Sequence, residues 1–305
     1  MGGGLRLLIY IVRRLKLTKA YMATFTKQEV INYYHHTQSH MRMFWHLDES
    51  MGLHYGIWDA NTKNHAQAII NTNRQLALLG EIKKEHNVLD AGCGVGGSSI
   101  FIAKNIGAQC LGITLSKRQV ATATKYAEKN GISQLVRFEE KDYTNTGYAD
   151  NSFDRAWALE SMSTAPDKFA MFKEMYRVLK PGGRFLLGDW CKPFPYNVDD
   201  HKCMQYMLYG WAIPDLLTYD ELKDIIGRLG FKEIAYRDVT KNILPSVKIA
   251  YRAGMFGMLG TKLYNLFKNG THFSRVHYKT GLGQYPAYKK GLWEYGLWVF
   301  QKPLH

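Results

Sequence analysis

The chain has 305 residues, of which 46% are apolar and 22% charged, and its formal net charge is +14 at pH 7. This composition excludes a disordered or low-complexity chain and is typical of a globular protein. The length allows one large domain with insertions, which we expect, or one domain with a small lid. The positive charge favours binding to phosphates, anionic lipids or acidic substrates but does not choose among them.

Residues 1–26 are predicted to form a basic N-terminal segment. Within it, residues 5–17 mix Leu, Ile and Val with four Lys or Arg residues. This run is too short and too charged to span a bilayer, but it suits peripheral contact with an anionic membrane. The alternatives are a helix docked on the protein's own surface and a natural start at Met22. We expect neither lipidation nor secretion from this segment.

The next part of the chain, residues 27–80, is predicted to be a helical cap. Its first half places aromatic and Met side chains at helical spacing, and a second helix is expected over residues 66–79, before Gly80.

Strand and helix patterns alternate from residue 87 onwards, which predicts a parallel sheet. Together with a final strand, they predict an α/β fold with a doubly wound, seven-stranded, mostly parallel sheet. The core spans residues 81–240, a lid is inserted at 241–293, and residues 294–305 hold the last strand and the C-terminus. The lid is assigned because that segment is too long for a connecting loop. The strands are expected at residues 87–92, 109–114, 136–140, 153–159, 184–190, 231–238 and 296–302.

The four cysteines show no CxxC pairing, and Cys110 and Cys191 fall inside predicted core strands. They are expected to be reduced, buried thiols, which fits a reducing, cytoplasmic compartment.

A glycine-rich turn follows the first predicted strand, in VLDAGCGVGG, with Asp90 at the strand end. Glycines permit positive φ and close approach of a ligand to backbone, and strand ends of an open α/β sheet are where such ligands bind. Dinucleotide-binding dehydrogenases share this turn, but they would carry an acidic residue where Thr114 ends the second strand. Here the acidic residue, Asp142, follows the third strand, where it can accept a hydrogen bond from an adenine amino group, and Tyr143 can pack on the ring.

The order of these motifs resembles the class I S-adenosylmethionine-dependent methyltransferases over about residues 55–240. Within that class the chain is most similar to the tocopherol and sterol C-24 methyltransferases, and less so to the cyclopropane fatty-acid synthases. The resemblance is carried by HYGxW at 54–58, GITLSxxQ at 112–119, E-(x)5-PDK at 160–168 and the strand ending in WC at 190–191.

The resemblance implies S-adenosyl-L-methionine as the cofactor and assigns a role to each matching position. The methionine part would be held by the first strand end and its turn, the ribose by the second strand end, and the adenine after the third strand, while a cap tyrosine closes over the sulfonium. These positions are, in that order, Asp90, Gly92, Gly94 and Gly96, then Thr114 and Gln119, then Asp142 and Tyr143, and Tyr55.

At two places this chain differs from the related families at positions that bear on the reaction they catalyse. The tocopherol and sterol groups have a histidine where this chain has Thr164, so a base or orienting group at that position is missing. Cyclopropane synthases have a cysteine at Ile57 and a glutamate at Ser163, so cyclopropanation is disfavoured.

Nucleic acid is disfavoured as a substrate although the chain is basic and rich in aromatic residues. An enzyme that methylates adenine amino groups usually carries a Pro-Pro-aromatic motif after the fourth strand, where this chain has LESM at 159–162. His36 and His40 have the spacing of metal ligands, but no carboxylate or cysteine partner is evident near them, so no metal site is predicted.

The leading hypothesis is C-methylation of a small lipophilic, isoprenoid-like acceptor, such as a sterol, a prenylated quinol or a related terpenoid. The alternatives are N- or O-methylation of a small amine or phenol, and a partner protein that binds the cofactor without turnover. Carbon methylation needs a base, and Glu160, directly beyond the fourth strand, is the best candidate, with His54 second. Aromatic and Met side chains of 193–214 and 241–293 either line an apolar pocket or bury the lid on the sheet. The sequence does not indicate an oligomeric state.

Overall fold

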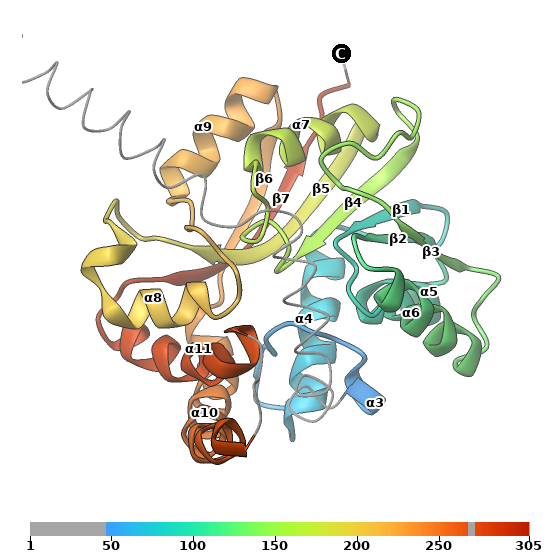
Figure 1. Cartoon of the computed structure of the whole chain (residues 1–305). Helices are drawn as coiled ribbons and strands as arrows, with labels where there is room; N and C mark the ends of the chain where they lie inside the picture. Colours follow the sequence, from blue (N-terminus) through green and yellow to red (C-terminus); the bar gives the residue numbers. More distant parts are fainter. Residues whose placement is uncertain (1–46, 268–271, 305) are drawn as a thin grey trace, which may run out of the picture.

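A computed structural model describes residues 47–267 and 272–304. At its centre lies a seven-stranded sheet of order β3-β2-β1-β4-β5-β7-β6 (Figure 1). Neighbouring strands run parallel, except that β7 is antiparallel to both β5 and β6. The predicted fold class is therefore confirmed. The strands are β1 (Asn87–Ala91), β2 (Gln109–Thr114), β3 (Val136–Glu140), β4 (Phe153–Leu159), β5 (Leu179–Cys191), β6 (Lys232–Asp238) and β7 (Glu294–Gln301).

Helices cover both faces of the sheet, which is why its central strands are apolar on both sides. Two hydrophobic clusters form the core. Along β4, Trp157 and Leu159 belong to one cluster, while Ala156 and Ala158 belong to the other. All four cysteines are free thiols, as predicted, and Cys93, Cys110 and Cys191 are buried, whereas Cys203 is only half-buried, contrary to the prediction. The helices are α3 (Leu47–Ser50), α4 (His65–Leu79), α5 (Gly97–Ile106), α6 (Lys117–Lys129), α7 (Lys168–Val178), the 3-10 turn η1 (Val198–Asp200), α8 (Lys202–Tyr209), α9 (Tyr219–Leu229), α10 (Thr240–Phe267) and α11 (His272–Lys289).

Most element boundaries agree with the sequence predictions, with one informative difference at β5. The strand begins at Leu179, five residues before the predicted start at Arg184. Leu179 pairs with Phe153, and the register shifts before Arg155 pairs with Arg184. The Lys-Pro-Gly-Gly sequence therefore makes an irregularity inside the strand pair rather than a break between elements.

The long segment between β6 and β7 forms the helix pair α10 and α11, which pack on each other, and α11 also packs on α8 (Figure 1). Glycine allows the close approach: a Cβ at Gly281 would lie 2.4 Å from the carbonyl oxygen of Ala250. On α8, Met204 and Met207 are fully buried in the core. These two side chains are therefore core residues, in the larger of the two hydrophobic clusters, rather than part of an open pocket. The domain boundaries stay predictions, and the first half of the expected cap lies outside the described residues.

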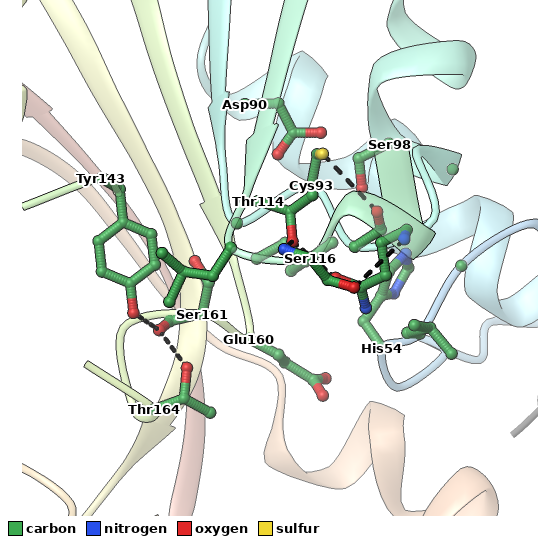
Figure 2. Close-up of a pocket in the computed structure, with 18 of the residues that line it drawn as sticks. His54, Asp90, Cys93, Ser98, Thr114, Ser116, Tyr143, Glu160, Ser161 and Thr164 are labelled. Atoms are coloured by element: carbon green, nitrogen blue, oxygen red, sulfur yellow. Dashed lines mark hydrogen bonds between the residues drawn. The ribbon is translucent and has the colours of Figure 1, made fainter. Parts of the chain in front are cut away.

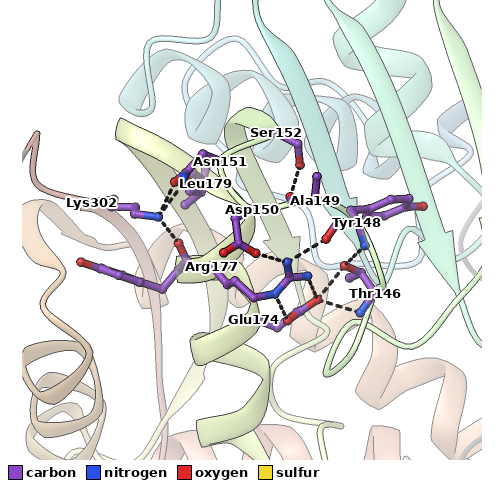
Figure 3. Close-up of polar contacts among 11 residues, drawn as sticks. Thr146, Tyr148, Ala149, Asp150, Asn151, Ser152, Glu174, Arg177, Leu179 and Lys302 are labelled. Atoms are coloured by element: carbon purple, nitrogen blue, oxygen red, sulfur yellow. Dashed lines mark hydrogen bonds and ion pairs between the residues drawn. The ribbon is translucent and has the colours of Figure 1, made fainter.

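A polar cluster joins the loop after β3 to α7 (Figure 3); within it Thr146 and Glu174 are buried, whereas Asp150 is exposed. The Glu174 carboxylate accepts hydrogen bonds from the backbone and hydroxyl of Thr146, at 2.8 and 2.6 Å, and from the Arg177 guanidinium. Arg177 also pairs with Asp150. Although burial opposes it, these partners hold the pKa of Glu174 below its usual value. The ionised carboxylate therefore stabilises the fold above pH 4.5, and this contribution is lost as the pH falls.

Replacing Glu174 by Ala is expected to lower the free energy of unfolding by about 2–3 kcal/mol at pH 7, because it leaves buried donors of Thr146 without an acceptor. Urea denaturation measures the change. The matched control is Glu128→Ala on the exposed side of α6, which should change stability by less than about 0.5 kcal/mol. Equal effects of the two substitutions would contradict this account.

Candidate active site

The strand order reverses at β1, which pairs with β2 on one side and β4 on the other. Connections leaving the carboxyl ends of β1 and β4 therefore diverge, and a crevice opens between them. A cavity lies at this point, bounded by the turn after β1, the ends of β2 and β4, and the loop before α4 (Figure 2). Its lining residues are Met51, Gly52, Leu53, His54, Asp90, Gly92, Cys93, Gly94, Gly97, Ser98, Thr114, Leu115, Ser116, Gln119, Tyr143, Leu159, Glu160, Ser161 and Thr164.

The glycine turn forms the floor of this cavity. Gly92, Gly94 and Gly96 have φ values of 90°, 54° and 88°, a region that favours glycine. A Cβ at Gly92 would lie 2.5 Å from the Cβ of Ser161, and one at Gly97 would lie 2.1 Å from the carbonyl oxygen of Met51. The turn thus brings backbone to the cavity and starts α5 beside it, so that the first N–H groups of this helix face a site suited to a polar ligand.

Polar side chains from the ends of β1 and β2 line one wall. The Asp90 carboxyl is buried and accepts a 2.6 Å hydrogen bond from the Ser99 hydroxyl. Burial raises its pKa to about 7. At the end of β2, the Thr114 hydroxyl donates to Oε1 of Gln119, at 2.6 Å. The structure therefore brings these predicted cofactor residues to one wall of one cavity.

Not every predicted cofactor residue touches the cavity. Tyr143 lines it and donates from its hydroxyl to the carbonyl oxygen of Ser161, at 3.2 Å. Asp142 is not among the lining residues; its carboxylate accepts hydrogen bonds from the backbone and hydroxyl of Thr144. Gly96 also lies behind the lining, where it caps α5 and packs close to Phe138.

Glu160 stands at the opposite wall, where it follows β4 and points into the cavity (Figure 2). Its φ of 51° is unusual for a residue other than glycine, and such strained residues cluster at functional sites. Oε1 accepts hydrogen bonds from the backbone N–H of Tyr55, at 2.7 Å, and from the Tyr295 hydroxyl, at 2.8 Å. Burial dominates these favourable contacts and raises the pKa of Glu160 to about 8.

His54 and Tyr55 come from the loop between α3 and α4. His54 lines the cavity, and its Nε2 is buried without a hydrogen-bond partner among the described residues. Burial lowers the pKa of His54 to about 4, so the ring is neutral at pH 7. Tyr55 lies behind the cavity wall, fully buried, and its hydroxyl donates to Gln284 of α11. Tyr55 thus connects Glu160 to the inserted helix pair.

Sequence reasoning missed Tyr295, Ser161 and Thr164. Tyr295 begins β7 and is 135 residues from its partner Glu160, so no spacing pattern links the two. Ser161 donates from its hydroxyl to the carbonyl oxygen of Ala91 and ties the end of β4 to the end of β1. Thr164, noticed only as a departure from a family pattern, lines the cavity and donates to the carbonyl oxygen of Ser161.

Comparisons with known proteins agree with this geometry. A family model described as a methyltransferase domain matches residues 88–183. An O-methyltransferase of Penicillium expansum is 33% identical over 224 residues, which cover 70% of this chain and 78% of that protein. The chain belongs to the class I S-adenosylmethionine-dependent methyltransferases. It is an enzyme of that family, and its cofactor is S-adenosylmethionine.

The names of other relatives indicate that those proteins act on lipids. Chloroplastic tocopherol O-methyltransferase of Arabidopsis thaliana is 28% identical over 275 residues, 83% of this chain and 76% of that protein. Sterol 24-C-methyltransferase of Aspergillus fumigatus is 40% identical over 176 residues, 57% of this chain and 47% of that protein. The solved structure of geranyl diphosphate C-methyltransferase from Streptomyces coelicolor shares the fold, with a TM-score of 0.69 at 19% identity, over 92% of this chain and 99% of that one.

S-adenosylhomocysteine is expected to raise the melting temperature of the methyltransferase, because a ligand that binds only the folded state stabilises it. Asp142→Ala should weaken this binding on the order of tenfold, the effect of losing one hydrogen bond to a charged group. Isothermal titration calorimetry measures the affinity. Because Asp142 also holds the Thr144 turn, Thr144→Ala is the control and should bind nearly as the wild type does. Undiminished affinity in a folded Asp142→Ala protein would remove Asp142 from the adenine site.

The folded-state pKa of Glu160, about 8, lies above its usual value of 4.5, so its contribution to stability is fully present below pH 4.5 and is lost as the pH rises through 8. Glu160→Gln should therefore stabilise the cofactor-free protein by on the order of a few kcal/mol at pH 8.5 and by much less at pH 5. Urea denaturation at the two pH values checks the difference. A gain that does not depend on pH would show that ionisation of Glu160 is not its cause.

Proposed function

We propose that this methyltransferase transfers the cofactor's methyl group to an unsaturated carbon of a lipophilic, isoprenoid-like acceptor such as a sterol, a prenylated quinol or a related terpenoid. The buried carboxyl of Glu160 carries the proposal. Methylation of an alkene carbon leaves a cation that must lose a proton, so a carbon acceptor needs a base at the site. The O–H and N–H protons of a phenol or an amine exchange readily with water, so such acceptors depend less on a base positioned at the site.

Two observations support the assignment of this cavity to the cofactor. The glycine turn admits a ligand against backbone, and His54, which also lines the cavity, offers its Nε2, partnerless among the described residues, as a polar contact. We assign Asp90 and the glycine turn to the methionine part, Thr114 with Gln119 to the ribose, and Tyr143 to the adenine, with Asp142 beside it. The cofactor supplies an electrophilic methyl group on a sulfonium cation. The protein aligns the acceptor with that group and excludes water.

Glu160 is suited to hold a proton at its carboxyl. Tyr55 N–H and Tyr295 O–H both donate to Oε1, which leaves Oε2 for the acceptor side of the cavity. A nearby positive charge lowers the pKa of a carboxyl, so the loaded site favours the ionised form that acts as a base. Tyr295 is a positioning residue in this scheme, because it acts through Glu160.

The lipophilic class is supported by the names of relatives, which include tocopherol and sterol methyltransferases. The cavity wall adds apolar side chains, namely Met51, Leu53 and Leu159, beside its polar ones. The aromatic and Met residues of α8 do not belong to this wall; Met204 and Met207 are core residues. Acceptor binding at this wall therefore does not rest on these two side chains.

Methylation of a phenolic oxygen on the same class of acceptor is the second candidate. It is favoured by the names of two relatives, the tocopherol and the Penicillium enzymes, both O-methyltransferases. The two candidates differ in their need for Glu160, and this difference separates them experimentally.

The test is incubation of the protein with methyl-labelled cofactor and a panel of acceptors: an unsaturated sterol, a prenylated quinol, a short isoprenoid, a simple phenol and a small amine. Mass spectrometry of the products identifies both the acceptor and the methylated atom. A carbon-methylated isoprenoid supports the proposal, whereas a hydrophilic amine as the sole acceptor overturns it. An O-methylated quinol selects the second candidate.

With the acceptor in hand, Glu160→Gln should lower kcat by on the order of a hundredfold or more and change KM little, as expected for a general base. Tyr295→Phe removes only the hydrogen bond and should give a smaller loss, on the order of tenfold, with a shifted pH profile of kcat. Steady-state kinetics against pH measures both. If Glu160→Gln retains full kcat, Glu160 is not the base.

A further inference from the structure

The positive charge of this protein is not spread evenly along the chain. Between Asp238 and Glu294 the sequence holds nine Lys and Arg residues and no Asp or Glu. By contrast, residues 47–238 and 294–305 together hold 24 Lys and Arg against 25 Asp and Glu. The sheet and its helices are therefore nearly neutral, the segment that contains α10 and α11 contributes +9 to the net charge of +14, and residues 1–46 contribute +6.

One face of α10 presents this charge to solvent beside exposed apolar side chains. Lys241, Lys248 and Arg252 are exposed, and they are spaced seven and four residues apart, so they lie along one face. The same face continues into Met255 and Phe256, whose exposed fractions are 40% and 76%. Burial of Ile243, Val247 and Ala250 turns the opposite face towards the core and fixes this orientation.

Aromatic residues on the neighbouring helix strengthen the pattern. Two ammonium groups lie near the ring centroid of Tyr285 on α11: Nζ of Lys248 at 5.9 Å and Nζ of Lys289 at 5.3 Å. The Tyr285 ring also packs against that of Tyr251, with 5.6 Å between the ring centroids. Tyr, Lys and Arg gathered next to exposed apolar side chains are typical of protein surfaces at the water–bilayer boundary, where amphipathic side chains meet both phases. In Figure 1 this helix pair lies on the opposite side of the sheet from α7 and α9.

We propose that the exposed face of α10, with Tyr285 and Lys289 of α11, docks the protein on an anionic lipid bilayer. The basic side chains meet lipid phosphates and acidic headgroups, while Met255 and Phe256 enter the boundary of the acyl region. No helix in the described part of the chain is long and apolar enough to cross a bilayer, so this contact is peripheral. A nucleic acid duplex, which meets a protein surface mainly through its phosphates, would use the basic side chains but gives no reason for an exposed Phe at the end of the same face.

The contact does not depend on the identity of the acceptor. It does fit the proposed function, since an isoprenoid acceptor partitions into membranes. The experiment below uses neither cofactor nor acceptor, so its outcome is independent of whether the proposed reaction is correct.

The test measures binding of the full chain to phosphatidylcholine vesicles with and without phosphatidylserine, by sedimentation at low and high ionic strength. The wild type should bind the anionic vesicles and release at high salt. Lys248→Glu combined with Arg252→Glu should weaken binding on the order of tenfold or more. Phe256→Ser, which changes no charge, should also weaken it severalfold. All of these side chains are exposed, so unchanged melting temperatures are expected and exclude unfolding as the cause.

The matched control is Lys125→Glu combined with Lys129→Glu on the exposed face of α6, which makes the same change of net charge. This control should bind within about twofold of the wild type. The proposal is overturned if both charge-reversed pairs lose affinity equally, because net charge alone then explains binding. Two other results also overturn it: unaltered binding of the α10 pair, and tighter binding of an oligonucleotide that does not respond to Phe256→Ser.

Discussion

The pairing of β1 with both β2 and β4 is the constraint on which the rest of this structure depends. Because the strand order reverses there, the ends of three strands and the glycine turn meet at one cavity. Ser161 connects the ends of β4 and β1, because its hydroxyl donates a hydrogen bond to the carbonyl oxygen of Ala91. The Ser161 side chain fits there only because residue 92 is a glycine. The cofactor side of the site is thus a direct consequence of sheet topology.

Burial without a countercharge dominates the chemistry of the site. Asp90 and Glu160 are both buried carboxyls with raised pKa values, about 7 and 8, and in each the largest cause is loss of hydration. Hydrogen-bond donors, rather than ion pairs, hold them: Ser99 donates to Asp90, and Tyr55 and Tyr295 donate to Glu160. Such groups destabilise the fold when ionised, and this cost is tolerated at sites where a proton is held or moved.

The inserted helix pair serves two regions of the molecule. On its inner side it supports the site, since Gln284 of α11 accepts from Tyr55, whose backbone donates to Glu160. On its outer side it carries the basic face of α10. The same helix pair therefore contacts the site through Gln284 and carries the proposed membrane contact on its outer side.

The sequence by itself determined the fold class, the family and the cofactor, because these depend on local signals: hydrophobic periodicity, the glycine turn after β1, and short motifs at strand ends. It also identified Glu160 as a candidate, since a carboxyl directly after β4 must lie near the sheet edge. Only the tertiary structure showed that Tyr295 holds Glu160, that Met204 and Met207 are core residues, and that Asp142 turns towards Thr144. Those facts depend on contacts between residues far apart in the chain or on side-chain direction, which periodicity and spacing do not encode.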